Sequence, residues 1–277
     1  MIHAFGAQRA SLAWRRTVVV AAIACASASA QAVSQTVSQM VAQTVSTHGW
    51  GSREIPYDGK VTFVRLRWRG GRLGTRRVMG GGPNFWLHEF PRAERNFMDT
   101  LSQVTAVDTR IDGSLILTLD DPQLFRHPIA VMWEPGFWTM TDQEAERLRA
   151  YLLKGGFVIF HDFEEEQWEN FEAQTQRVIP DAHWFRMDPS HGVFRALFQM
   201  DLDDFQHPPG HHLYGFTPEY FGLFEDNNPK GRLLAIANYN TNLAEFWQVA
   251  GSGFFPVDSD NDAFKLGINY IIYGMTH

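Results

Sequence analysis

A short strand without a single polar residue constrains the fold of this chain more than any other feature. In the stretch GGFVIFHD, two glycines end a helix and residues 157–160 are all apolar. A strand without alternating polar side chains is buried on both faces, which is typical of a parallel sheet covered by helices. We therefore expect an α/β fold.

The other periodic segments alternate between strands and helices. Further strands are predicted at residues 60–68, 115–121, 128–136 and 232–240, and helices at residues 91–105, 141–155, 171–178 and 262–277. The clearest helix begins with a capping box, Thr141 with Glu144, and ends at Gly155. On the first of these helices, Phe97, Leu101 and Val104 share one face. This order predicts a three-layer Rossmann-like or flavodoxin-like sandwich around a mostly parallel sheet.

The N-terminus has the pattern of an export signal. Three arginines precede an apolar run at residues 17–24 and a small-residue cleavage site, so residues 1–32 are predicted to be a signal peptide. The run is too short to span a bilayer, so we expect no transmembrane helix in the mature chain. The general and twin-arginine routes both stay open, and a lipid anchor on Cys25 is less favoured. Residues 33–56, rich in Val, Ser, Gln and Thr, are predicted to be a disordered linker ahead of a domain at residues 57–277.

Charge and cysteine content exclude several functions. The net charge of −7 argues against nucleic-acid binding, which requires a basic domain. Cys25 is the one cysteine, so a processed chain has no disulfide, thiolate metal site or cysteine nucleophile. The serine motif GxSxG is also missing from the sequence.

Polar residues follow several predicted strands at the ends where α/β sheets bind ligands. They are Asp120 and Asp121, Glu134, His161 and Asp162, and Asn240 and Asn242. In a parallel sheet these side chains are expected to meet in one ligand-binding crevice. Carboxylates gathered there either share protons or hold a cation.

Two chemistries remain open for the crevice. Asp120, Glu134 and Asp162 offer oxygen ligands for a divalent cation, but no spaced metal motif such as HExxH is present, so no cofactor is expected. His161 or His191 is the candidate general base of a hydrolase, with Asp162 orienting it. The acids at residues 164–166 are predicted to be a solvated helix start.

Six segments together resemble one family: FVRLRW, NFMDTLSQVT, LDDPQLFRHPIAVMWEPG, LRAYLLKGGFVIFHDF, HGVFRALF and LGINYIIYGMTH. Over residues 60–277 the chain is similar to the DUF4159 family of bacterial proteins. The resemblance implies a fold of the class I glutamine amidotransferase-like, flavodoxin-like superfamily, and it carries no established function. Family members commonly have two aspartates where this chain has His161 and Asp162, and an Asn-then-Asp pattern where this chain has Asn240-Thr241-Asn242.

The leading hypothesis is an exported cell-envelope domain that binds a small molecule or an envelope protein, without amidotransferase chemistry. The alternative is a hydrolase that uses a His/Asp pair, with or without a divalent cation. A third interpretation treats Trp168, Trp184 and Trp247 as a surface for a partner protein.

Overall fold

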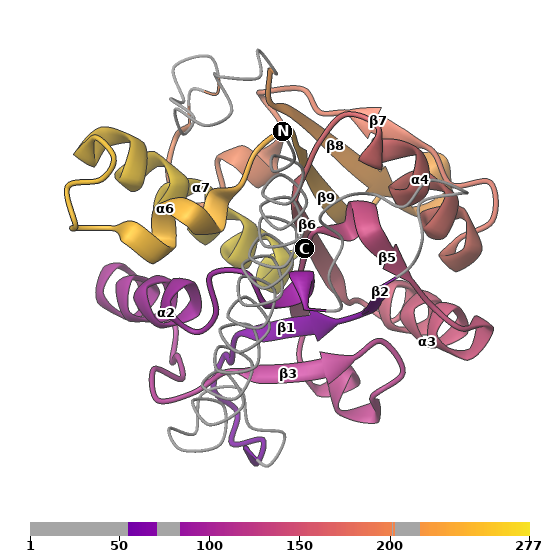
Figure 1. The fold of residues 1–277 in the computed structure, drawn as a ribbon, viewed down its shortest axis with the longest axis horizontal. Helices are drawn as coiled ribbons and strands as arrows, with labels where there is room; N and C mark the ends of the chain where they lie inside the picture. The colour runs from indigo at the N-terminus through magenta and orange to yellow at the C-terminus, as the bar shows by residue number, and fades with distance from the viewer. Residues whose placement is uncertain (1–54, 71–83, 201, 203–216) are drawn as a thin grey trace, which may run out of the picture. The chain divides into compact units, whose positions relative to one another are not determined.

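A seven-stranded sheet forms the centre of the domain in the computed structural model, which describes residues 55–70, 84–200, 202 and 217–277 (Figure 1). Neighbouring strands along the sheet are β3 (Leu115–Thr118), β1 (Val64–Arg67), β4 (Ile129–Trp133), β6 (Phe157–Phe163), β9 (Leu233–Tyr239), β8 (Glu219–Phe224) and β7 (Trp184–Arg186). The strands from β3 to β9 are parallel, whereas β8 runs antiparallel to both of its neighbours. The predicted α/β fold with a mostly parallel sheet is confirmed.

Helices cover both faces of this sheet. Figure 1 shows α2 (Arg92–Val104), α6 (Leu243–Val249) and α7 (Val257–Thr276) on one side, and α3 (Asp142–Leu153) and α4 (Gln167–Val178) on the other. A separate two-stranded ribbon pairs β2 (Arg69–Gly70) with β5 (Trp138–Thr139).

The apolar run of β6 fills the cores on both faces of the sheet. Ile159 packs into the core under α2, α6 and α7, whereas Val158 and Phe160 pack into the core under α3 and α4. Successive strand residues point to opposite faces, so a strand between two helical layers favours apolar side chains at consecutive positions.

Local signals located the helices well. The capping box of α3 is present: the Glu144 backbone N–H donates to Thr141 Oγ1 (3.2 Å), and the Thr141 N–H donates to the Glu144 carboxylate (2.7 Å). Gly155 follows α3 with φ of 109°, a conformation that favours glycine. The inward face predicted for α2 is wrong at one residue, because Val104 is 47% exposed.

Several elements were not predicted: the strands β7 and β8, the ribbon strands β2 and β5, and the short helix α6. The predicted signal peptide and all but the last two residues of the predicted linker lie outside the described residues. No helix in the described ranges is long and apolar enough to cross a membrane.

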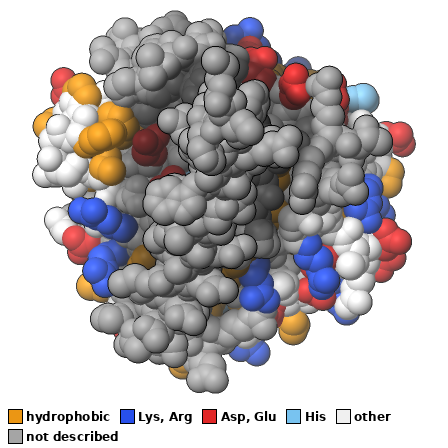
Figure 2. Space-filling view, in the orientation of Figure 1, with side chains coloured by type: hydrophobic (Ala, Val, Ile, Leu, Met, Phe, Trp, Pro, Cys, Tyr) orange, Lys and Arg blue, Asp and Glu red, His pale blue; other side chains and the backbone are white. Residues whose placement is uncertain are grey.

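Acidic and basic side chains are interspersed over the described part of the face shown in Figure 2. Proteins that bind DNA or RNA instead gather Lys and Arg into a contiguous patch or stripe. The described part of this face is therefore of mixed charge.

Candidate functional site

The strand order creates a crevice at the carboxyl edge of the sheet. The chain leaves β1 for β3 on one side and returns to β4 on the other side of β1. Crossover connections diverge at such a point, and open α/β sheets bind ligands there. Four chain segments reach this edge: residues 84–91 ahead of α2, Glu134 after β4, Asp162 near the end of β6, and Asn242 after β9.

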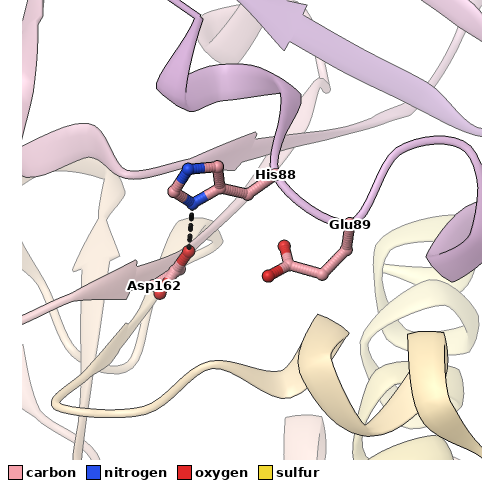
Figure 3. A group of neighbouring side chains, drawn as sticks. All are labelled: His88, Glu89 and Asp162. Carbon is pink, nitrogen blue, oxygen red and sulfur yellow. Dashed lines mark ion pairs between the residues drawn. The ribbon is translucent and has the colours of Figure 1, made fainter. Parts of the chain in front are cut away.

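Three side chains from two of these segments point toward one another at the crevice (Figure 3). One ligand atom from each of His88, Glu89 and Asp162 lies within 4.8 Å of the other two. His88 Nδ1 is also 2.8 Å from Glu134 Oε1 and 3.7 Å from Asp162 Oδ2. We call His88, Glu89, Glu134 and Asp162 the acidic cluster.

Glu89 is oriented by two donors from other elements. Trp133 Nε1, at the end of β4, donates to Glu89 Oε2 (2.8 Å), and Asn242 Nδ2 donates to Glu89 Oε1 (3.1 Å). Asn242 is itself held in place because its Oδ1 accepts the N–H groups of Ala244 and Glu245 and so caps α6. The position of the Glu89 carboxylate thus depends on β4 and α6 together.

A buried arginine holds the loop that carries His88 and Glu89. Arg65 on β1 is fully buried, pairs with Glu94 of α2, and lies over the Trp133 ring with its guanidinium carbon 3.3 Å from the ring centre. Its Nη1 donates to the backbone carbonyls of Trp86 (2.7 Å) and His88 (3.0 Å). The loop is therefore anchored at its base by a residue that does not belong to the acidic cluster.

Three members of the acidic cluster have left-handed backbone conformations. Their φ angles are 57° for Glu89, 49° for Glu134 and 64° for Asp162. This region costs an L-residue about 1–2 kcal/mol, and Asp tolerates it better than Glu. Strain of this kind gathers at ligand and active sites, where surrounding structure holds it in place.

Burial and electrostatic interactions within the acidic cluster shift the pKa values of its members. Burial, together with repulsion from Asp162, raises the pKa of Glu89 to about 7. Burial also raises the pKa of Asp162 to about 7, with repulsion from Glu134 adding to the rise, and burial raises the pKa of Glu134 as well. The carboxylates of Asp162 and Glu134 raise the pKa of His88 to about 10. Among the described residues no Lys or Arg forms an ion pair with these acids.

A pocket of about 260 Å³ opens beside the acidic cluster and shares two of its carboxylates. Its apolar wall consists of Phe85, Phe137 and Phe163, and its polar wall consists of Glu134, Asp162, Glu164 and Gln167. Aromatic walls with a few convergent polar groups are typical of small-molecule sites. Glu164 was predicted to belong to a solvated helix start, but it lines this pocket, whereas Glu165 and Glu166 are exposed.

The structure brings three of the residues singled out in the sequence into contact with the cluster: Glu134, Asp162 and Asn242. His161, the residue before Asp162 on β6, is fully buried, with its ring centre 4.2 Å from that of Trp133. Burial lowers the pKa of His161, so its imidazole is neutral. A general base must reach its substrate, and this imidazole has no exposed surface.

His191 lies apart from the other candidate residues. Its ring packs on Phe224 and Tyr273, and Tyr273 packs on Phe157, the first residue of β6. These neighbours place His191 at the amino edge of the sheet, opposite to the crevice. The turn pattern around His191 predicted a loop correctly, but a loop pattern does not say at which edge the loop lies.

Three further residues have local structural roles or lie to one side. Asp120 and Asp121 follow β3, the outermost strand, so β1 lies between them and β4, and Asp121 Oδ1 accepts the N–H of Gln123. Asp120 therefore lies two strands away from Glu134 along the sheet. Asn240 Oδ1 accepts the N–H of Glu165, and Asn240 Nδ2 donates to the Thr217 carbonyl, so this side chain ties two loops together.

The aromatic partner surface is also corrected. Trp247 is 1% exposed and packs on Phe97 inside the core of α2, α6 and α7. Trp168 and Trp184 are half-buried and lie in an aromatic cluster around Phe171.

His88 and Glu89 were missed. One available signal is their position: an adjacent His-Glu pair stands just before Pro91, in the segment that leads from the first strand to the first helix. In an α/β fold this connection reaches the carboxyl edge of the sheet, where ligands bind.

Fold and site define an α/β domain with an acidic crevice at the carboxyl edge of a mostly parallel sheet. Residues 76–275 match the family described as Domain of unknown function (DUF4159), and the chain belongs to this family. The resemblance seen in the sequence is confirmed at the level of the family. No curated protein matches the chain.

Proposed function

We propose that this protein is an exported ligand-binding domain whose crevice holds a divalent metal ion on His88, Glu89 and Asp162. One observation carries the proposal: an imidazole nitrogen and two carboxylate oxygens from two chain segments lie within 4.8 Å of one another. Buried acids that gather in such a place either retain protons or bind a cation. The buried Oδ2 atom of Asp162, which accepts no hydrogen bond in the described structure, offers a free ligand atom.

The geometry needs only a small adjustment to accept an ion. Metal–ligand bonds of about 2.1 Å in a tetrahedral site place the ligand atoms about 3.4 Å apart. The three ligand atoms, which lie within 4.8 Å of one another, therefore approach by up to about 1.4 Å around an ion. Loss of the His88 proton to solvent then frees Nδ1 as a ligand, because only neutral imidazole binds metal.

The donor set favours particular metals. One nitrogen with two or three oxygens suits Mn²⁺, Fe²⁺ or Zn²⁺ better than Ca²⁺ or Mg²⁺, which prefer oxygen ligands alone. Glu134, 2.8 Å from the imidazole, is placed to orient His88 or to join as a fourth ligand.

Thermal unfolding of the purified chain with Mn²⁺ or Zn²⁺ against a chelator tests the metal site. An ion at about 100 times its Kd stabilises a fold by about 2.7 kcal/mol, which corresponds to about 5–10 °C in Tm for a domain of this size. We expect His88→Ala and Asp162→Ala to abolish the shift and Asp120→Ala to retain it. An equal shift in Asp162→Ala would show that the ion binds elsewhere.

Binding is favoured over hydrolysis by the burial of His161. The hydrolase alternative needed His161 or His191 as a base, and one is enclosed while the other lies at the far edge of the sheet. The described residues contain no cysteine that could replace them.

Two parts of the proposal concern the family and the compartment. When the strands of the sheet are numbered in chain order, the first four lie side by side in the order 2-1-3-4, as β3, β1, β4 and β6. This order supports a flavodoxin-like superfamily. Export rests on the N-terminal pattern of residues 1–32.

Fractionation of a bacterial host that expresses the full chain tests export. The domain is expected in the periplasmic fraction with a shortened N-terminus, and deletion of residues 2–32 is expected to retain it in the cytoplasm. Recovery of the full chain from the cytoplasm with Met1 still present would contradict export.

A further inference from the structure

The pocket beside the acidic cluster has a wall composition that selects for a positively charged ligand. Three phenylalanines form one side, with the Phe85 and Phe137 rings 5.2 Å apart and edge-to-face. Three carboxylates converge on the other side, and the buried Oδ2 of Asp162 makes no hydrogen bond in the described structure. A neutral apolar ligand would cover these carboxylates without pairing them, which is costly.

Charge remains unbalanced even with a divalent ion in place. The ion offsets the two carboxylates that bind it, Glu89 and Asp162. Glu134 and Glu164 add two further carboxylates to the pocket wall, and among the described residues the one ion pair of either is that of Glu134 with His88 (2.8 Å).

Glu164 is held at the pocket by its neighbours. Its backbone N–H donates to Gln167 Oε1 (3.2 Å), and its carbonyl accepts the Gln167 N–H (2.9 Å). Gln167 packs so closely on Gly136 that a Cβ on that glycine would lie 2.3 Å from the Gln167 Cβ. This packing fixes the wall from which the Glu164 side chain projects.

We propose that the pocket binds a small organic cation, an amine or guanidinium on a short apolar chain. The cationic group lies between Glu134 and Glu164, and the chain lies against the three phenylalanines. The inference rests on the proposed binding function and adds its ligand class. Charge-assisted hydrogen bonds to carboxylates and cation–π contacts to aromatic faces are the interactions that recognise such a group. A pocket of about 260 Å³ suits a ligand of this size rather than a folded partner.

An NMR titration of the full chain with n-butylguanidinium, in the presence of Zn²⁺, tests this inference. The uncharged isostere n-butylurea serves as the control. We expect saturable binding with Kd of about 1 mM, which is typical of a ligand with eight non-hydrogen atoms. The urea is expected to bind at least tenfold more weakly.

Matched variants separate the pocket from general surface charge. Glu164→Gln is expected to weaken n-butylguanidinium binding about tenfold, since it removes one charge-assisted contact. Glu166→Gln makes the same change on an exposed neighbour and is expected to leave binding unchanged. Equal weakening in both variants, or equal binding of the urea, would overturn the inference.

The Zn²⁺-induced Tm shift of the same samples distinguishes the two proposals. A normal metal shift without guanidinium binding refutes the organic cation and leaves the metal site standing. Guanidinium binding that needs Glu164 but is accompanied by no metal shift refutes the metal site and supports the pocket inference.

Discussion

Replacing Arg65 by methionine is expected to lower the free energy of unfolding by about 3–5 kcal/mol, because it leaves a buried carboxylate unpaired. Arg65 and Glu94 both have fully buried side chains, and they pair between β1 and α2. The substitution also removes the donor to the carbonyls of Trp86 and His88 and the cation above the Trp133 ring. Urea denaturation of wild type and variant measures the change.

A double variant separates the role of Arg65 in the fold from its role in the site. Arg65→Met with Glu94→Leu replaces the buried ion pair by apolar side chains, a change that is often neutral or stabilising. We expect most of the lost stability to return. The carbonyls of Trp86 and His88 still lack their donor, so metal affinity is expected to stay about tenfold or more below that of wild type, as for other residues that orient ligands.

Two results would contradict this account. A loss below about 1 kcal/mol in Arg65→Met would mean that Glu94 is rehydrated or paired without the arginine. Full metal affinity in the double variant would mean that the loop carrying His88 and Glu89 is held by other contacts, such as those of Glu89 to Trp133 and Asn242.

The parts of the fold that the sequence predicts are those encoded locally. The apolar run of β6 and the capping box of α3 involve residues within a few positions of one another, so their signals survive without knowledge of the partner elements. The pair β7 and β8 was missed because β7 has only three residues and gains its role by pairing with β8.

The site was predictable only in part. The position of a residue at the end of a strand identifies the edge of the sheet at which it lies, but not where along that edge it lies. Glu134 follows β4, Asp162 lies near the end of the neighbouring strand β6, and the two side chains meet as expected. Asp120 satisfies the same rule but follows the outermost strand. Glu89 enters the site through hydrogen bonds to residues 44 and 153 positions away, and no local pattern encodes such contacts.

The contribution of the acidic cluster to the stability of the metal-free protein is expected to fall as pH rises from 4 to 10. The carboxyls of Glu89 and Asp162 have pKa values of about 7 in the folded protein and about 4 when unfolded. Between pH 4 and 7 the folded state therefore binds more protons, so rising pH lowers the free energy of unfolding. The pKa of His88, about 10 when folded against about 6.5 when unfolded, extends the decline, because its contribution is complete below pH 6.5 and lost by pH 10.

Asp162→Asn isolates the contribution of the cluster from that of other titrating groups. Asn tolerates the left-handed backbone at this position, so the variant changes the charge and leaves the φ of 64° acceptable. With chelator present, we expect the variant to gain stability relative to wild type on going from pH 5 to pH 8, by about 2 kcal/mol. Urea midpoints at the two pH values give the comparison.

A bound metal ion is expected to reverse this pH dependence. Metal ligands must be deprotonated, so affinity, and with it stabilisation, increases as Glu89, Asp162 and His88 lose their protons. Wild type with Zn²⁺ should therefore become more stable between pH 5 and 7, while Asp162→Asn should behave alike with Zn²⁺ and with chelator. If wild type with chelator instead gains stability over this range relative to the variant, its buried carboxyls do not carry raised pKa values, and the charge deficit that calls for a cation disappears.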